Sequence, residues 1–283
     1  MSGDPGEPEV LVLPTADAAL DAAADAIARG LAEAVDRRGR ANWATTGGST
    51  APGLYRRLAE GPHRESVPWH AVHVWFGDDR FVPRDHPLSN VLPVDQGLVA
   101  FGAYAGQSGS GESGIDIATG IEAGVMIPIE NVHAFPTGEA IGEAREPSWA
   151  AARYEAELRA AVAAGELEVV DGWPAFDMFF LGIGTDGHVL SVFPGSPAWD
   201  AAAWAMGVEA PTHVEPHVRR VTLHPETLRV TPRLLVVATG DSKAEPVARV
   251  FGDRVDARAL PAQTARRSGA TWLLDDAAAP LTR

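Results

Sequence analysis

Residues 10–39 read VLVLPTADAALDAAADAIARGLAEAVDRRG, and this stretch predicts a β-strand followed directly by an amphipathic helix. The apolar run Val10–Leu13 indicates the strand, and Thr15 is typical of a residue that caps a helix start. Gly39 is typical of the residue that follows a helix end. Between them, apolar residues recur at helical spacing, namely Leu20, Ala24, Ile27, Leu31 and Val35. A strand joined to a helix is the repeating unit of α/β proteins.

The alternation of strands and helices continues along the chain. Helical stretches are predicted around Leu54–Leu58, Trp149–Ala164 and Lys243–Phe251. Strands are predicted at Asn42–Thr46, Val72–Phe76, Met178–Leu181, Arg220–Leu223, Leu234–Ala238 and Thr271–Leu274. We therefore expect an α/β fold with a mostly parallel, Rossmann-like sheet flanked by helices.

We expect residues 1–283 to form a single domain with one insertion. The segment Gly97–Gly124 is rich in Gly, Ser and Ala and has no clear period, which predicts a flexible surface insertion. A plain surface loop and a lid over a substrate are both compatible with this composition.

Composition and charge exclude several classes of protein. The chain carries 23 Lys and Arg against 38 Asp and Glu, and this net charge of −15 argues against nucleic acid as a main partner. The chain has no cysteine, which excludes disulfides, a thiolate nucleophile and Cys-based metal sites and fits a reducing cytoplasm. The first ten residues lack Lys and Arg, unlike a secretory signal, and no uncharged apolar stretch is long enough to span a membrane. We expect a cytoplasmic protein with no membrane partner.

A first candidate for anion binding is Gly47–Gly48–Ser49–Thr50, which follows one predicted strand and precedes a helix. Backbone N–H groups at such a position can hold a phosphate, with help from the helix dipole. A structural turn that ends in a helix-capping Ser or Thr has the same sequence pattern. The motif lacks the Gly-Lys-Ser/Thr ending of a P-loop.

Two further polar motifs follow predicted strands. Asp78–Asp79–Arg80 comes after Val72–Phe76, where two carboxylates and a guanidinium can orient hydroxyls and hold an anion, or form a solvated, self-paired turn. Asp186–Gly187–His188 comes after a Gly-rich stretch that ends a buried strand. There a carboxylate two residues from an imidazole is suited to orienting a general base, although a lone His is more often structural.

Lys243 is the only lysine in the chain and stands in Gly240–Asp241–Ser242–Lys243 at a predicted helix start. Its position suits phosphate binding. The alternative is that it is a lysine retained by chance, without a special role, in a chain whose other basic residues are arginines.

Metal sites have little support, because His213 and His217 are four residues apart but Pro211 and Pro216 argue against a shared helical face. A Gly-x-Ser-x-Gly elbow is also absent, so water is the better nucleophile candidate. We expect no cofactor and no metal.

Taken together, the motifs resemble the 6-phosphogluconolactonase family over nearly the whole chain. The likeness rests on order and spacing as well as on the motifs themselves. These are Thr46–Gly47–Gly48–Ser49–Thr50, Phe76–Gly77–Asp78–Asp79–Arg80–Phe81–Val82–Pro83 with Ser89–Asn90, Leu181–Gly182–Ile183–Gly184–Thr185–Asp186–Gly187–His188, Arg220–Val221–Thr222–Leu223, Gly240–Asp241–Ser242–Lys243–Ala244, Leu260–Pro261–Ala262–Gln263 and Trp272–Leu273–Leu274–Asp275.

The resemblance implies a fold shared with glucosamine-6-phosphate deaminases and hydrolysis of 6-phospho-D-glucono-1,5-lactone in the oxidative pentose phosphate pathway. By motif position it makes His188 the general base that activates water, with Asp186 or Asp78 orienting the imidazole ring. The remaining matched positions would line the substrate or hold its phosphate, namely Asp78, Arg80, Asn90, Arg220, Lys243 and the loop of Gly47, Gly48, Ser49 and Thr50.

The chain departs from the family pattern at several positions. Asp79 stands where Glu is usual, Val189–Leu190 where Thr-Ala is usual, and His224 where Thr is usual, and the segment 97–124 is longer than expected. Two other functions remain open. One is a glucosamine-6-phosphate isomerase or deaminase, disfavoured because Ser191–Gly195 lacks the Asn-Glu-Pro that follows the Gly-His loop in that branch. The other is a catalytically silent sugar-phosphate-binding protein, against which the retained His188 weighs.

Overall fold

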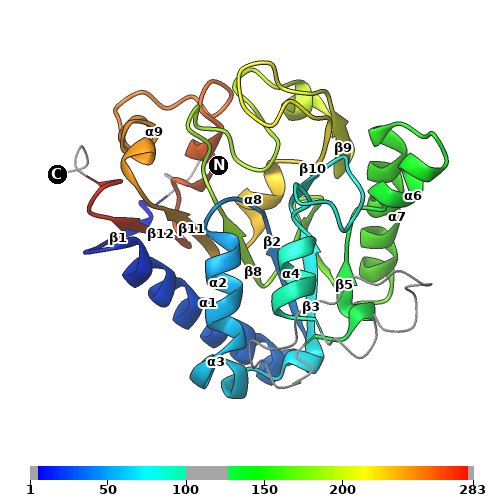
Figure 1. Cartoon of the computed structure of the whole chain (residues 1–283), viewed down its shortest axis with the longest axis horizontal. Coiled ribbons are helices and arrows are strands. Elements are labelled where there is room, and N and C mark those ends of the chain that lie inside the picture. Colours follow the sequence, from blue (N-terminus) through cyan, green and yellow to red (C-terminus); the bar gives the residue numbers. More distant parts are fainter. Residues whose placement is uncertain (1–5, 100–126, 280–283) are drawn as a thin grey trace, which may run out of the picture.

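The computed structural model describes residues 6–99 and 127–279, in which a seven-stranded sheet forms the centre of the molecule (Figure 1). All neighbouring strands in it run parallel. In spatial order the strands are β1 (Glu9–Leu13), β12 (Ala270–Asp275), β11 (Leu234–Ala238), β8 (Met178–Leu181), β2 (Ala41–Thr45), β3 (Val72–Phe76) and β5 (Val132–His133). The prediction of a mostly parallel α/β sheet is confirmed.

Helices flank this sheet. The longest helix of the described residues begins and ends where the capping residues in the sequence predict. Helix α1 (Ala16–Arg38) begins after Thr15, whose Oγ1 accepts a hydrogen bond from the Ala18 amide at 3.1 Å, and it ends at Gly39 in the left-handed conformation. Its buried face packs across β12, β11, β8 and β2. The other helices are α2 (Ala51–Ala59), α3 (Gly61–Ser66), α4 (Leu92–Gly97), α6 (Thr137–Gly142), α7 (Pro147–Ala163), α8 (Glu226–Val230) and α9 (Ala244–Val250).

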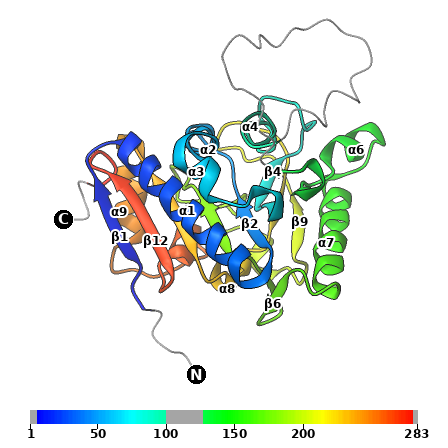
Figure 2. The ribbon, with the colours of Figure 1, turned by 90° about the horizontal axis from the view of Figure 1, so that it is seen from below.

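One predicted strand belongs to a different sheet. Arg220–Leu223 forms β10, which pairs antiparallel with β4 (Asp78–Arg80) and β9 (Ala205–Val208), so its expected place in the parallel sheet is wrong. The chain reaches β10 from β9 without an intervening helix, and such a connection suits antiparallel neighbours, not a parallel crossover. Helix α7 lies against β9 at the side of the molecule (Figure 2). A hairpin of β6 (Glu168–Val170) and β7 (Trp173–Ala175) completes the strands of the described residues.

The order of the strands decides where a ligand site can form. Strands β2 and β8 are neighbours, and the chain proceeds from β2 to β3 on one side and from β8 to β11 on the other. Such a change of direction leaves a crevice at the carboxyl ends of the two strands. Large fully buried side chains fix these strands in the core, including Trp43 on β2 and Phe179 and Phe180 on β8.

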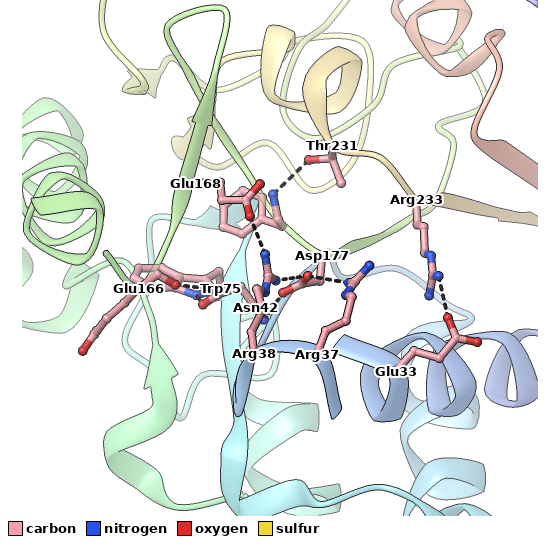
Figure 3. A network of polar contacts seen from close by, with 11 residues as sticks. Glu33, Arg37, Arg38, Asn42, Trp75, Glu166, Glu168, Asp177, Thr231 and Arg233 are labelled. Carbon is pink, nitrogen blue, oxygen red and sulfur yellow. Dashed lines mark hydrogen bonds and ion pairs between the residues drawn. The ribbon is translucent and has the colours of Figure 1, made fainter. Parts of the chain in front are cut away.

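At the amino ends of β2 and β8, a polar network ties the end of α1 to the sheet (Figure 3). Asp177 is 7% exposed and accepts a hydrogen bond from the Asn42 amide at 2.8 Å. It pairs with Arg38, which also reaches Glu168 at 2.7 Å, and with Arg37 at 3.6 Å. We call Asp177 and these partners the amino-end network. Its arginines neutralise carboxylates of the protein itself.

Two sequence predictions bear on the rest of the chain. The predicted insertion 97–124 lies outside the described residues except for its first three positions, 97–99. Within the two described stretches, no helix combines the length and the apolar character needed to cross a membrane.

Candidate functional site

A pocket of about 250 Å³ opens at the carboxyl ends of β2, β8 and β11 and beside β4, near the lower end of the sizes common for ligand sites. Its lining brings together eight of the eleven predicted site residues, although they come from six separate places in the sequence. These are Gly47, Gly48, Asp78, Arg80, Asn90, His188, Arg220 and Lys243. Of the other three, Asp186 contacts His188 from behind, whereas Ser49 and Thr50 are absent from the lining.

The loop after β8 presents the His188 imidazole to the pocket. Gly184 packs so closely under this ring that a Cβ built there would lie 2.0 Å from His188 Nδ1, so only glycine fits. The chain turns back on itself through a hydrogen bond from the Gly184 amide to the His188 carbonyl at 2.9 Å. Glycine is therefore needed at position 184, because a larger residue would displace the His188 ring.

Asp186 orients the His188 ring. Its Oδ1 lies 2.5 Å from His188 Nδ1 and also accepts the His188 backbone amide at 3.0 Å. Because a carboxylate only accepts, Nδ1 carries the proton and Nε2 keeps its lone pair in the neutral ring. Burial raises the pKa of Asp186, but hydrogen bonds from His188 and His213 outweigh it and hold the pKa below its usual range. In this tautomer the lone pair on Nε2 is free to accept a proton from water, as a general base requires.

The short strand β4 carries a second acidic group into the pocket. Asp78 is 4% exposed, and its Oδ2 accepts a hydrogen bond from Ser191 at 2.7 Å while its Oδ1 accepts one from Asn90 at 3.1 Å. Asn90 in turn lies so close to Gly47 that a Cβ at this glycine would meet Asn90 Oδ1 at 1.8 Å. Asp78 therefore contacts a hydroxyl and an amide and does not touch the His188 ring, so of the two carboxylates suggested as ring-orienting partners Asp186 makes the contact.

The neighbouring carboxylate, Asp79, points into the protein. It accepts hydrogen bonds from the backbone amides of Asn90 and Arg80, at 2.7 and 2.8 Å, and from the Ser89 hydroxyl at 3.1 Å. Burial raises its pKa to about 7 against the effect of these bonds. The reading of Asp78–Asp79–Arg80 as a solvated turn is wrong, because β4 pairs with β10 and buries both carboxylates.

Three cations line the pocket, and we call Arg80, Arg220 and Lys243 the pocket cations. Lys243 Nζ donates to the Ile183 carbonyl at 2.7 Å, and Arg220 Nη2 donates to the Pro216 carbonyl at 3.1 Å. Arg80 Nη1 donates to Asn90 Oδ1 and the Leu88 carbonyl, each at 2.9 Å. Burial lowers the pKa values of Arg220 and Lys243.

The positive charge of the pocket cations is not neutralised locally by ion pairs. Among residues 6–99 and 127–279, no ion pair within 4.0 Å includes any of the three. The Nε atoms of Arg80 and Arg220 are buried without a hydrogen-bond partner. A buried donor without a partner carries a free-energy cost, so the protein itself does not fully satisfy the Arg80 and Arg220 guanidinium groups. The arrangement is suited to a phosphate or carboxylate.

The departures from the family pattern fit their surroundings. Leu190 adopts a left-handed backbone conformation, with φ of 55°, and its side chain packs over Gly77, where a Cβ would approach Leu190 Cδ2 to 2.6 Å. The room left by Gly77 thus accommodates the larger side chain. His224 is buried and stacks on Trp173 with ring centroids 4.0 Å apart, and burial lowers its pKa.

Sequence reasoning missed residues of the loop between β9 and β10. Val214 and Glu215 line the pocket, and His213 contacts Asp186. Prolines flank these positions and no periodicity marks them, so the sequence carries no signal for their proximity to His188. In the part of the chain that the structure covers, no cluster of three or more His, Cys, Asp or Glu side chains is arranged to hold a metal ion. The lack of a cofactor stays a prediction.

Comparisons with known proteins agree with this geometry. Residues 14–273 match the sequence model of a family described as glucosamine-6-phosphate isomerases/6-phosphogluconolactonase. The chain is 31% identical to a 6-phosphogluconolactonase from Nostoc sp., over 95% of this chain and 96% of the relative. It superposes on the solved 6-phosphogluconolactonase of Trypanosoma brucei with a TM-score of 0.75, 25% identity and coverage of 96% and 98%. A solved monomeric glucosamine-6-phosphate deaminase shares the fold, with a TM-score of 0.69, 19% identity and coverage of 96% and 99%.

Proposed function

Because the chain belongs to the glucosamine-6-phosphate isomerase/6-phosphogluconolactonase family, we propose that it hydrolyses 6-phospho-D-glucono-1,5-lactone to 6-phospho-D-gluconate. One observation carries this proposal beyond family membership. The His188–Asp186 dyad faces the same pocket as three cations that form no ion pair among the described residues. A base for water and a site for a phosphate therefore share one small cavity.

The proposed chemistry begins at His188 Nε2. The neutral imidazole removes a proton from a water molecule as its oxygen attacks the lactone carbonyl carbon, and the tetrahedral intermediate then collapses by expelling the ring oxygen. Asp186 stabilises the imidazolium that forms, through the 2.5 Å contact with Nδ1. The protonated ring returns its proton to the departing oxygen, so protons balance over one turnover. General-base catalysis of this kind contributes about 10²–10⁴-fold.

The pocket cations supply binding energy away from the reacting carbon. A phosphate held by Lys243, Arg80 and Arg220 fixes the distance between the sugar carbonyl and His188, which lowers the entropic part of the barrier. Asp78 and Asn90 are placed to accept from or donate to sugar hydroxyls at the same wall. The amides of Gly47 and Gly48, with Ser49 and Thr50 at the following helix start, stay candidates for the phosphate.

The oxidative pentose phosphate pathway and a cytoplasmic location complete the proposal. The location is supported by the cysteine-free composition, which suits a reducing compartment. The net charge of −15 supports the absence of nucleic acid as a partner.

The proposal is tested by supplying freshly generated 6-phosphogluconolactone and coupling product formation to oxidation of 6-phosphogluconate, with correction for spontaneous ring opening. In parallel, glucosamine 6-phosphate is supplied and ammonia release is measured. We expect rapid hydrolysis of the lactone and no ammonia. Lactone hydrolysis at the spontaneous rate would refute the proposal. Ammonia release would then identify a deaminase, and binding of either sugar phosphate without turnover would identify a silent binding protein.

A further inference from the structure

A second histidine contacts the carboxylate that orients His188. His213 lies in the loop between β9 and β10, and its Nε2 is 2.9 Å from Asp186 Oδ2. The other oxygen of the same carboxylate, Oδ1, contacts His188 Nδ1. Since a carboxylate only accepts, His213 is the donor in this bond. Asp186 is therefore held from both sides, by one imidazole that lines the pocket and by one that does not.

One aromatic side chain packs beside both imidazoles and helps to hold them in place. Phe193 is 8% exposed, and its ring lies 4.8 Å from the His188 ring and 5.7 Å from the His213 ring. It thus forms a shared apolar wall for both histidines. The guanidinium carbon of Arg220 lies 5.5 Å from the centre of the Phe193 ring, so this ring also contacts one of the pocket cations. The His213 side chain itself is about half exposed, at 52%.

We propose that His213 is a positioning residue for the lactonase reaction, which acts by fixing Asp186 in the orientation that keeps the proton of His188 on Nδ1. The inference rests on the proposed function. A carboxylate held through only one oxygen can rotate about its Cβ–Cγ bond, and His188 can then adopt the tautomer with the proton on Nε2. That tautomer has no lone pair facing the pocket and cannot accept a proton from water.

The charged groups around Asp186 make the His213 contact distinct from a general field effect. His188 and His213 contact the carboxylate directly, while Lys243 and Arg220 act on it through space. Both cations lie toward the pocket, where the substrate phosphate is expected. The hydrogen bond from His213 lowers the pKa of Asp186, which keeps the carboxylate ionised and able to accept from His188.

The test compares His213→Ala, His213→Gln and the matched control His217→Ala. His217 lies in the same loop, is 50% exposed and faces Glu215 instead of Asp186. For His213→Ala we expect kcat to fall about five- to tenfold, with KM unchanged, because only a fraction of the protein then holds His188 with a free lone pair on Nε2 that can accept a proton from water. The glutamine amide can donate to the same oxygen, so His213→Gln restores most of kcat. His217→Ala behaves as wild type.

A double-variant cycle separates positioning from a structural role. In an Asp186→Asn background, His213→Ala produces no further loss of kcat if His213 acts through Asp186. An equal loss in both backgrounds, or equal rates for the Ala and Gln variants, would overturn the proposal. Melting curves show whether each variant is folded, and if His213→Ala is not, His213→Phe, which keeps a ring but cannot donate to Asp186, takes its place in the comparison.

Nitrogen-15 NMR of the His188 ring reports its tautomer directly, so it tests the role of His213 without an activity assay. Wild-type protein and His217→Ala should show His188 with the proton on Nδ1, and His213→Ala should show a mixture of both tautomers. An unchanged His188 tautomer in His213→Ala would contradict the role. If wild-type protein hydrolyses no lactone, the proposed function fails, and the tautomer measurement alone decides whether His213 positions the dyad.

Discussion

The two ends of strands β2 and β8 differ in how they treat buried charge. At the amino ends, Asp177 pairs with Arg38, and the same arginine also reaches Glu168 (Figure 3). At the carboxyl ends, the pocket cations donate to carbonyl and amide oxygens and form no ion pair among the described residues. Charges that are paired within the protein stabilise the fold. Cations that form no ion pair with the protein are suited to binding an anionic ligand, such as a phosphate. The comparison separates charges that stabilise the fold from charges that we propose bind a ligand.

The largest effect is expected at the amino end. Asp177→Ala removes the acceptor of the buried Asn42 amide and the partner of Arg38, and we expect the free energy of unfolding to fall by roughly 2–4 kcal/mol. Lactonase kcat should not change at a temperature where the variant is folded. Urea unfolding and the coupled assay measure the two quantities.

Glu168→Ala is the matched control in the same network. The Glu168 side chain is 65% exposed, and an exposed ion pair contributes less than about 1 kcal/mol. A large loss of kcat in folded Asp177→Ala would break the separation between the two ends.

The next effect concerns the pH dependence of stability. Burial raises the pKa of Asp79 from its ordinary value of 3.8 to about 7 in the folded protein. Between these values the folded protein holds a proton that the unfolded chain has released, so stability is highest at low pH and falls as pH rises through 7. This carboxyl alone predicts a decline of roughly 2 kcal/mol between about pH 5 and pH 7.

Asp79→Asn should remove that decline. The amide oxygen of asparagine can accept from the Asn90 and Arg80 amides, and its NH₂ group can donate to the Ser89 hydroxyl. Urea unfolding over this pH range should therefore give a flatter curve for Asp79→Asn than for wild type or for the exposed control Asp253→Asn. Parallel curves for all three proteins would mean that Asp79 is ionised in the fold.

The smallest expected effect is a change in ligand affinity at the pocket. Lys243→Ala removes one of the three cations, and we expect the dissociation constant for 6-phosphogluconate to rise about tenfold, the size of one charge-assisted hydrogen bond. Arg37→Ala, which removes an exposed cation from the amino-end network, should bind this product as wild type does. Calorimetric titration measures both. Equal weakening in the two variants would point to the overall field of the protein and not to a phosphate site.

The sequence predicted the parts of the fold that depend on local patterns. Strands β3, β8 and β11 begin and end at the predicted residues, and Thr15 and Gly39 bound α1, because apolar runs and caps act through neighbouring residues. The sheet that contains β10 was not predicted. Its partners β4 and β9 are short, and β4 consists of Asp78–Arg80, three charged residues that propensity assigns to a turn.

The candidate site was predictable to the extent that its residues follow strands in recognisable motifs. Lys243 and His188 are 55 positions apart in sequence, and the parallel register of β8 and β11 brings their loops to the same edge of the sheet. The burial of Asp79 and the contact of His213 with Asp186 depend on tertiary pairing between β4, β10 and the loop before β10. No local pattern records that pairing.

The most direct test of the account is the lactone hydrolysis rate of His188→Ala beside wild type, with both proteins shown to be folded by their melting curves. We predict that wild type exceeds spontaneous ring opening by a wide margin and that kcat of the variant falls by about 10²–10⁴-fold, the contribution of a general base. Binding of 6-phosphogluconate should persist in the variant, because the pocket cations are intact. A folded His188→Ala protein that hydrolyses the lactone at the wild-type rate would contradict the account.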